Sequence, residues 1–94
     1  MVDNWLYTNG IVHAYERKLP IEADVFSDFY IRSGNVYIEF WGMESDAKYS
    51  AREKVKQKAY SENGFNLIEL NDNDLEHLDD IMPKKLLQFD IRVH

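Results

Sequence analysis

Two segments decide the fold: Ser27-Asp28-Phe29-Tyr30-Ile31 and, after four intervening residues, Val36-Tyr37-Ile38-Glu39-Phe40-Trp41. Both segments are rich in β-branched and aromatic residues, and Arg32-Ser33-Gly34-Asn35 between them favours a turn. The stretch therefore predicts a β-hairpin with strands at residues 25–31 and 36–41. A turn over Arg32 to Asn35 places Asp28 opposite Glu39 on the same face of the hairpin, because side chains alternate between faces.

The segments on either side of the hairpin predict an α/β fold. We expect a short helix over residues 2–9 and a strand over 11–19. A helix over 46–62 has Asp46 as its N-cap, and a strand over 65–70 is buried on both faces. Asp72 or Asp74 caps a helical turn, and the last helix covers residues 78–88 with Pro83 at or near a break. A hairpin followed by a βαβ crossover gives a mixed central sheet of about four strands flanked by helices.

Length and composition limit the class of protein. Ninety-four residues make one domain, here 1–94, and the absence of cysteine excludes disulfides and thiolate metal sites. No apolar run is long enough for a membrane helix and no secretory signal is apparent, so we expect no membrane partner and a cytoplasmic location. The net charge of −6 argues against a protein that coats nucleic acid by charge alone. Five basic residues nevertheless gather in the helix over residues 46–62.

The facing carboxylates of Asp28 and Glu39 are the strongest candidate for a functional site. Opposed Cβ atoms lie about 4.5–5.5 Å apart, so both groups stay ionised in an apolar setting only if a cation lies between them. Hard oxygen ligands suit Mg²⁺, Mn²⁺ or Ca²⁺. Two alternatives remain: one acid faces solvent after a one-residue slip of the register, or the two form a glycosidase-type acid/base pair. The three histidines, His13, His77 and His94, lack metal-ligand spacing and are assigned to core or surface roles.

The order of these motifs resembles the PD-(D/E)XK nuclease superfamily, and most of all its very-short-patch-repair-endonuclease-like branch. The hairpin is similar to the motif that carries its two acids. Tyr49, Arg52, Lys56 and Tyr60 resemble a conserved helix motif of that branch, and residues 65–70 with Leu78-Asp79-Asp80 resemble its closing strand and helix. The resemblance implies a restriction-endonuclease-like sheet and Mg²⁺- or Mn²⁺-dependent hydrolysis of DNA. Asp28 and Glu39 are then metal ligands and catalytic residues.

The chain departs from the family pattern at three places. Ser27 replaces the motif proline, and Trp41 stands where the motif lysine is expected. The resemblance therefore assigns to Lys56 or Arg52 the positive charge that positions water or stabilises the transition state. The first helix is short. Either the chain is a fragment of a longer protein that lacks the first helix, or Glu16 or Glu44 serves as a third acid.

The sequence thus predicts a single nuclease-like domain that acts as a Mg²⁺-dependent endodeoxyribonuclease. The first alternative is a catalytically impaired module of the same fold that binds nucleic acid or a protein partner. The second is a purely structural or dimerising domain. For the nuclease we expect DNA as the partner, with Trp41, Lys48 and Lys54 as nucleic-acid contacts. In each case we expect a homodimer if a missing first helix leaves apolar surface exposed.

Overall fold

The computed structural model describes residues 1–41 and 47–93, with residues 47–50 described by their backbone alone. Four strands form one sheet in the order β1-β2-β3-β4, with β1 at Ala14–Tyr15, β2 at Phe29–Ile31, β3 at Val36–Phe40 and β4 at Asn66–Leu70. The pairs β1/β2 and β2/β3 are antiparallel, whereas β3 and β4 are parallel. The predicted mixed sheet of a hairpin plus a crossover is therefore confirmed.

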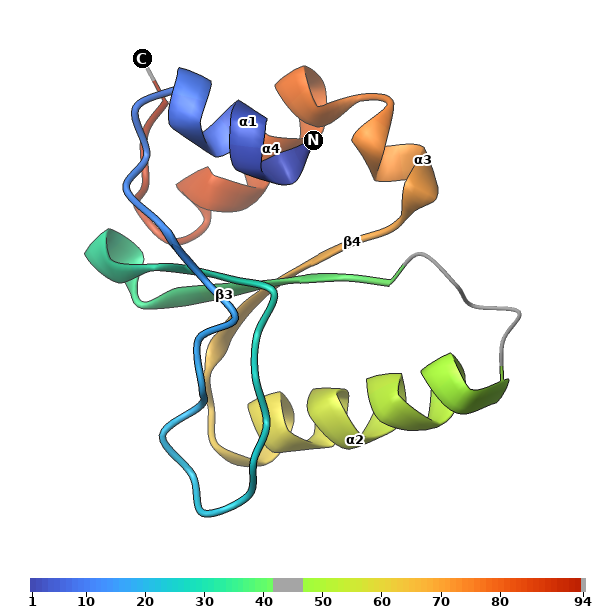
Figure 1. Cartoon of the computed structure of the whole chain (residues 1–94). Helices are drawn as coiled ribbons and strands as arrows, with labels where there is room; N and C mark the ends of the chain where they lie inside the picture. The colour runs from blue at the N-terminus through green and yellow to red at the C-terminus, as the bar shows by residue number, and fades with distance from the viewer. Residues whose placement is uncertain (42–46, 94) are drawn as a thin grey trace.

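Helices cover both faces of this sheet (Figure 1). The long helix α2 (Ala47–Glu62) connects β3 to β4 and lies on one face. On the other face lie α1 (Val2–Thr8), α3 (Asp72–Leu75) and α4 (Leu78–Leu87). Within the described residues, no helix combines the length and apolar character that crossing a bilayer requires.

The hairpin has the predicted register. Phe29 pairs with Ile38, and Ile31 pairs with Val36 across a short 3₁₀ turn at Arg32–Gly34. Asn35 closes the turn in the left-handed region with φ of 51°, a conformation that asparagine tolerates better than most residues. Because the register is fixed, every second residue of β2 and β3 faces α2 and the others face α1 and α4.

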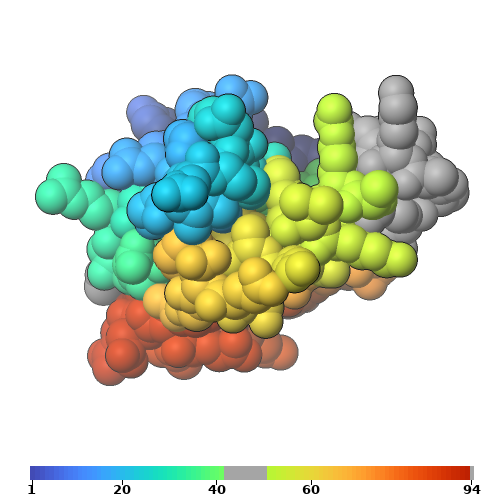
Figure 2. Space-filling view, turned by 90° about the horizontal axis from the view of Figure 1, so that it is seen from below, coloured from blue at the N-terminus to red at the C-terminus, as the bar shows by residue number. Residues whose placement is uncertain are grey.

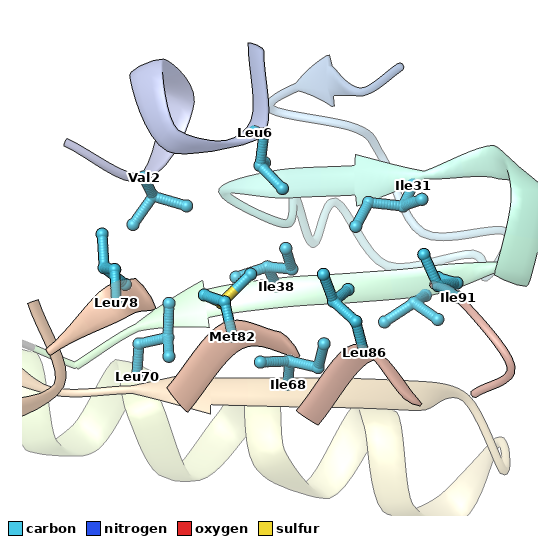
Figure 3. Close-up of a cluster of buried hydrophobic side chains, with 11 residues drawn as sticks. Val2, Leu6, Ile31, Ile38, Ile68, Leu70, Leu78, Met82, Leu86 and Ile91 are labelled. Atoms are coloured by element: carbon cyan, nitrogen blue, oxygen red, sulfur yellow. The ribbon is translucent and has the colours of Figure 1, made fainter. Parts of the chain in front are cut away.

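The larger core lies between the sheet and the helices α1 and α4 (Figure 3). Leu78, Met82 and Leu86 recur every four residues, so they form one stripe of α4 against the sheet. They pack with Ile38 and with Leu6 of α1, both fully buried. The hairpin face that carries Ile31, Val36 and Ile38 therefore forms part of the main core.

The smaller core, between the sheet and α2, is aromatic. Tyr37 of β3 lies 5.6 Å from Tyr60 of α2 and 5.4 Å from Phe65, measured between ring centroids. Leu19 completes the buried cluster. This core holds α2 close to the face that carries Glu39, and therefore positions the candidate site.

The end of α2 is set by local sequence. Gly64 has φ of 64°, which favours glycine, and its N–H donates to Ser61 while the N–H of Phe65 donates to Tyr60. These two bonds form a Schellman motif that stops the helix and turns the chain directly into β4. Asp46, the predicted N-cap of this helix, lies outside the described residues.

The first two strands are shorter than predicted. The strand expected over residues 11–19 is reduced to Ala14–Tyr15 because Glu16 adopts a φ of 42° that breaks the extended backbone. The strand expected over 25–31 begins only at Phe29, although an isolated bridge joins Lys18 to Phe26. Between them, residues 19–25 form a loop that extends toward α2 (Figure 1).

The C-terminal region corrects three local predictions. Asn71, and neither Asp72 nor Asp74, is the N-cap of α3, with Asp74 completing a capping box. Helix α4 continues through Pro83 without the predicted break. Strand β4 is not buried on both faces, since Glu69 is exposed at this edge of the sheet.

Candidate metal and phosphate site

Asp28 lies immediately before β2 and reaches across to β3. Its Oδ2 accepts a hydrogen bond of 2.8 Å from the backbone N–H of Phe40. Its own carbonyl accepts from Glu16 at 3.1 Å, which ties this point of the chain to the end of β1. The side chain of Asp28 is therefore fixed next to Glu39, as the hairpin register predicted.

Glu39 is a fully buried carboxylate, with 0% of its surface exposed, in the middle of β3. A buried carboxylate is costly unless it is paired and hydrogen bonded. Two side chains of α2 meet this requirement. The Lys56 ammonium lies 3.1 Å from both carboxylate oxygens, and the Tyr60 hydroxyl donates to Oε1 at 2.8 Å.

The spacing of Lys56 and Tyr60 explains why both reach Glu39. Residues four apart lie on the same face of a helix, one above the other. Both side chains therefore reach Glu39 from the same side of α2. The aromatic core below Tyr60 holds that side of the helix against the sheet.

Burial and the neighbouring acid change the protonation of Glu39. Desolvation, followed by repulsion from Asp28, raises the pKa of Glu39 from 4.5 to about 7, although Lys56 and Tyr60 act in the opposite direction. Burial and the Glu39 charge likewise raise the pKa of Tyr60, so its hydroxyl remains a donor. Glu39 thus holds a proton more tightly than an ordinary glutamate does, and an added cation would shift it toward the carboxylate.

Asp28 and Glu39 open onto a pocket of about 210 Å³, which we call the acid pocket. Its lining consists of Asp28, Glu39, Phe40, Trp41, Arg52, Glu53 and Lys56. Three acids, Asp28, Glu39 and Glu53, and two cationic side chains, Arg52 and Lys56, line it. A pocket of this composition can hold a small cation together with an anionic group such as a phosphate.

Trp41, which stands in the place of the motif lysine, is held away from the carboxylates. Its indole N–H donates to Glu69 of β4 at 2.8 Å, and Gln57 of α2 donates to the same oxygen at 2.9 Å. Trp41 still lines the acid pocket, so its ring is available at the rim. The cationic group beside the two acids comes from α2, at Lys56.

Of the other residues singled out from the sequence, some line the acid pocket and others do not. Arg52 is exposed at the pocket, and Lys54 is exposed on α2 without lining it. Glu16 is exposed and does not line the pocket. Glu44 and the side chain of Lys48 lie outside what the structure describes. His13 contacts Asp3 at 2.7 Å, in keeping with a structural role.

Sequence reasoning missed two acids near the site. Glu53 lines the acid pocket, and Glu69 anchors Trp41. The helical spacing of Glu53 and Lys56, three residues apart, was the available signal for the first. The position of Glu69 near the site depends on its parallel pairing with Glu39 across β3 and β4, and only the sheet register reveals that pairing.

The fit of a divalent metal is partial. Among residues 1–41 and 51–93, no three histidine, cysteine or acidic side chains gather closely enough to hold an ion by themselves. Asp28 and Glu39 supply two hard carboxylates, which suits Mg²⁺ because this ion keeps several waters and takes phosphate oxygens as further ligands. Burial and then the Asp28 charge raise the pKa of Glu39, and a cation bound between the two acids would lower it again.

Comparison with known proteins gives no match to a protein family, to a curated protein sequence or to a solved structure.

Proposed function

We propose that this chain is a restriction-endonuclease-like, metal-dependent endonuclease that hydrolyses phosphodiester bonds of nucleic acid, with DNA as the expected substrate. One observation carries the proposal. Asp28, Glu39 and Lys56 come from three separate segments and meet at one pocket, with Lys56 contacting both oxygens of Glu39. Two acids and a lysine are the set that the resemblance requires, here with the lysine supplied by α2.

Each side chain has a role that follows from its position. A divalent ion, when bound by Asp28 and Glu39, supplies charge neutralisation at the phosphoryl group and lowers the pKa of water. The backbone N–H of Phe40 holds Asp28 in place, and Tyr60 does the same for Glu39. Lys56 balances the carboxylate charge and has ammonium hydrogens for a phosphate oxygen. Arg52, exposed at the pocket, is placed to bind a phosphate in the same way.

The second candidate is a catalytically impaired module of the same fold that binds nucleic acid or a protein partner. A specific contact favours it: both oxygens of Glu39 already bond to Lys56, and one of them also bonds to Tyr60. A carboxylate neutralised by a lysine needs no metal for stability. The two candidates therefore differ in whether Mg²⁺ or Mn²⁺ binds at Asp28 and Glu39.

A nicking assay on supercoiled DNA tests the proposal. The wild type is expected to relax the plasmid with Mg²⁺ or Mn²⁺ and to be inactive with EDTA. Asp28→Asn keeps the acceptor for Phe40 but loses the charge, and it is expected to be inactive. Lys56→Met is expected to lose about 100-fold or more, whereas the exposed control Lys54→Met retains activity.

Two results would contradict the endonuclease proposal. Equal nicking by the wild type and by Asp28→Asn would mean that the activity arises elsewhere. Binding of DNA without nicking, under every metal tried, would favour the impaired module.

A further inference from the structure

A second pocket of about 560 Å³ adjoins the acid pocket. We call it the loop–helix pocket, because one wall is the loop before β2 and the other is α2. Figure 2 shows this loop, in blue to cyan, beside the yellow-green helix. Arg52 and Lys56 line both pockets, so the two are neighbours along α2.

Besides the charged Asp24, Arg52 and Lys56, the loop–helix pocket has apolar side chains on both walls. Val25 and Phe26 form the loop side, and Ala51 and Val55 form the helix side. Phe26 is 45% exposed and Val55 is 62% exposed. The exposed Phe26 and Val55 side chains in the lining favour a ligand with an apolar face.

The loop wall is fixed by hydrogen bonds. The N–H of Leu19 donates to Val25 at 2.8 Å, and the N–H of Ser27 donates to Arg17 at 2.8 Å. The Lys18 ammonium donates to the carbonyl of Ile21 at 2.8 Å. Phe26 is therefore presented by a backbone that is paired on both sides, which reduces the entropy lost when a ligand stacks on its ring.

We propose that the loop–helix pocket holds an unpaired nucleobase next to the phosphate in the acid pocket, so that the substrate is single-stranded nucleic acid or a strand with an unpaired nucleotide. The inference rests on the proposed function for the identity of that phosphate. Arg52 and Lys56 match the phosphate charge, Phe26 offers a stacking surface, and the Asp24 carboxylate is an acceptor for base N–H groups. A paired base remains in the duplex stack and does not reach such a pocket.

Binding measured by fluorescence anisotropy in EDTA tests the inference without cleavage. The probes are a labelled single-stranded oligonucleotide and the blunt duplex of the same sequence. We expect tighter binding of the single strand, weakened about 5- to 150-fold in Phe26→Ala because one stacked base is lost. Phe26→Tyr should bind as the wild type does. The matched control is Tyr7→Ala, which removes an 81% exposed aromatic ring from α1, on the opposite face of the sheet.

A second variant distinguishes a lost contact with the ligand from misfolding of Phe26→Ala. Val55→Glu adds a negative charge to the helix wall at an exposed position and should also weaken single-strand binding. Duplex binding equal to or tighter than single-strand binding, or no loss in both Phe26→Ala and Val55→Glu, overturns the inference. Metal-dependent nicking without a preference for single strands would contradict the proposed base pocket and support the proposed nuclease activity. Single-strand binding that depends on Phe26, without cleavage, would support the proposed base pocket and contradict the proposed nuclease activity.

Discussion

The ammonium of Lys56 lies 3.1 Å from each carboxylate oxygen of Glu39, a side chain with no exposed surface. The pair joins the only helix described on this face of the sheet, α2, to the centre of β3. It also places a lysine beside the two acids although the expected lysine position is occupied by Trp41. Stability and the proposed activity therefore depend on the same contact.

The free energy of unfolding should fall as pH rises from about 5 to 8 in metal-free buffer. In this interval the unfolded chain has an ionised Glu39 while the native chain keeps its proton, because the native pKa is raised from 4.5 to about 7. The native state binds more protons, so stability is lost as pH rises through the native pKa, by about 3 kcal/mol in total. Urea denaturation at each pH measures this. Glu39→Gln should flatten this part of the profile, and an unchanged slope in that variant would contradict the assignment.

Removing Lys56 should destabilise the protein more at pH 8 than at pH 5. Lys56→Met leaves the carboxylate buried without its cation, at a cost of about 3 kcal/mol at pH 8, the lower end for a broken buried pair because 26% of the Lys56 side chain is exposed. At pH 5 the proton on Glu39 removes most of this penalty. Lys54→Met, an exposed control on the same helix, should change stability by less than about 0.5 kcal/mol. Equal losses for both variants would argue against the ion pair.

Tyr60→Phe should raise the native pKa of Glu39 further. The variant keeps the ring that packs against Tyr37 but removes the hydroxyl that donates to the carboxylate. The expected loss of stability is about 1–3 kcal/mol at pH 8 and less at pH 5. The midpoint of the pH-dependent transition should move upward. A midpoint that stays in place would show that the hydroxyl does not act on Glu39.

The register of the hairpin can be tested separately from its chemistry. Ile38 is fully buried toward α4, so Ile38→Ala should cost about 2–5 kcal/mol at any pH. Val12→Ala, at a position 84% exposed, is the control and should be close to neutral. A small effect at Ile38 with a large effect at Val12 would indicate a different packing of the sheet.

Much of this arrangement was predictable because it depends on short-range rules. The turn at Arg32 to Asn35 fixes the register, and the register sets which face Glu39 occupies. The four-residue spacing of Lys56 and Tyr60 places them together on α2. The single crossover between β3 and β4 then puts that helix over the sheet.

The parts that were not predictable depend on contacts between distant segments. The shortening of β1 follows from the backbone of Glu16, whose sequence gives no turn signal. The hydrogen bond that holds Trp41 is accepted by Glu69, which pairs with Glu39 across the parallel strands β3 and β4. The wall formed by Phe26 depends on hydrogen bonds from the loop to Arg17 and Leu19, which are made in tertiary structure and leave no periodic pattern.

Thermal melting at pH 8 with and without Mg²⁺ or Mn²⁺ tests the central claim most directly. If Asp28 and Glu39 share an ion, saturating metal should raise the stability of the wild type by about 3 kcal/mol at 100 times the dissociation constant. The gain should vanish in Asp28→Asn and persist in Asp24→Asn, a control in the neighbouring loop. A melting temperature that does not respond to metal, or that responds equally in Asp28→Asn, would contradict the account.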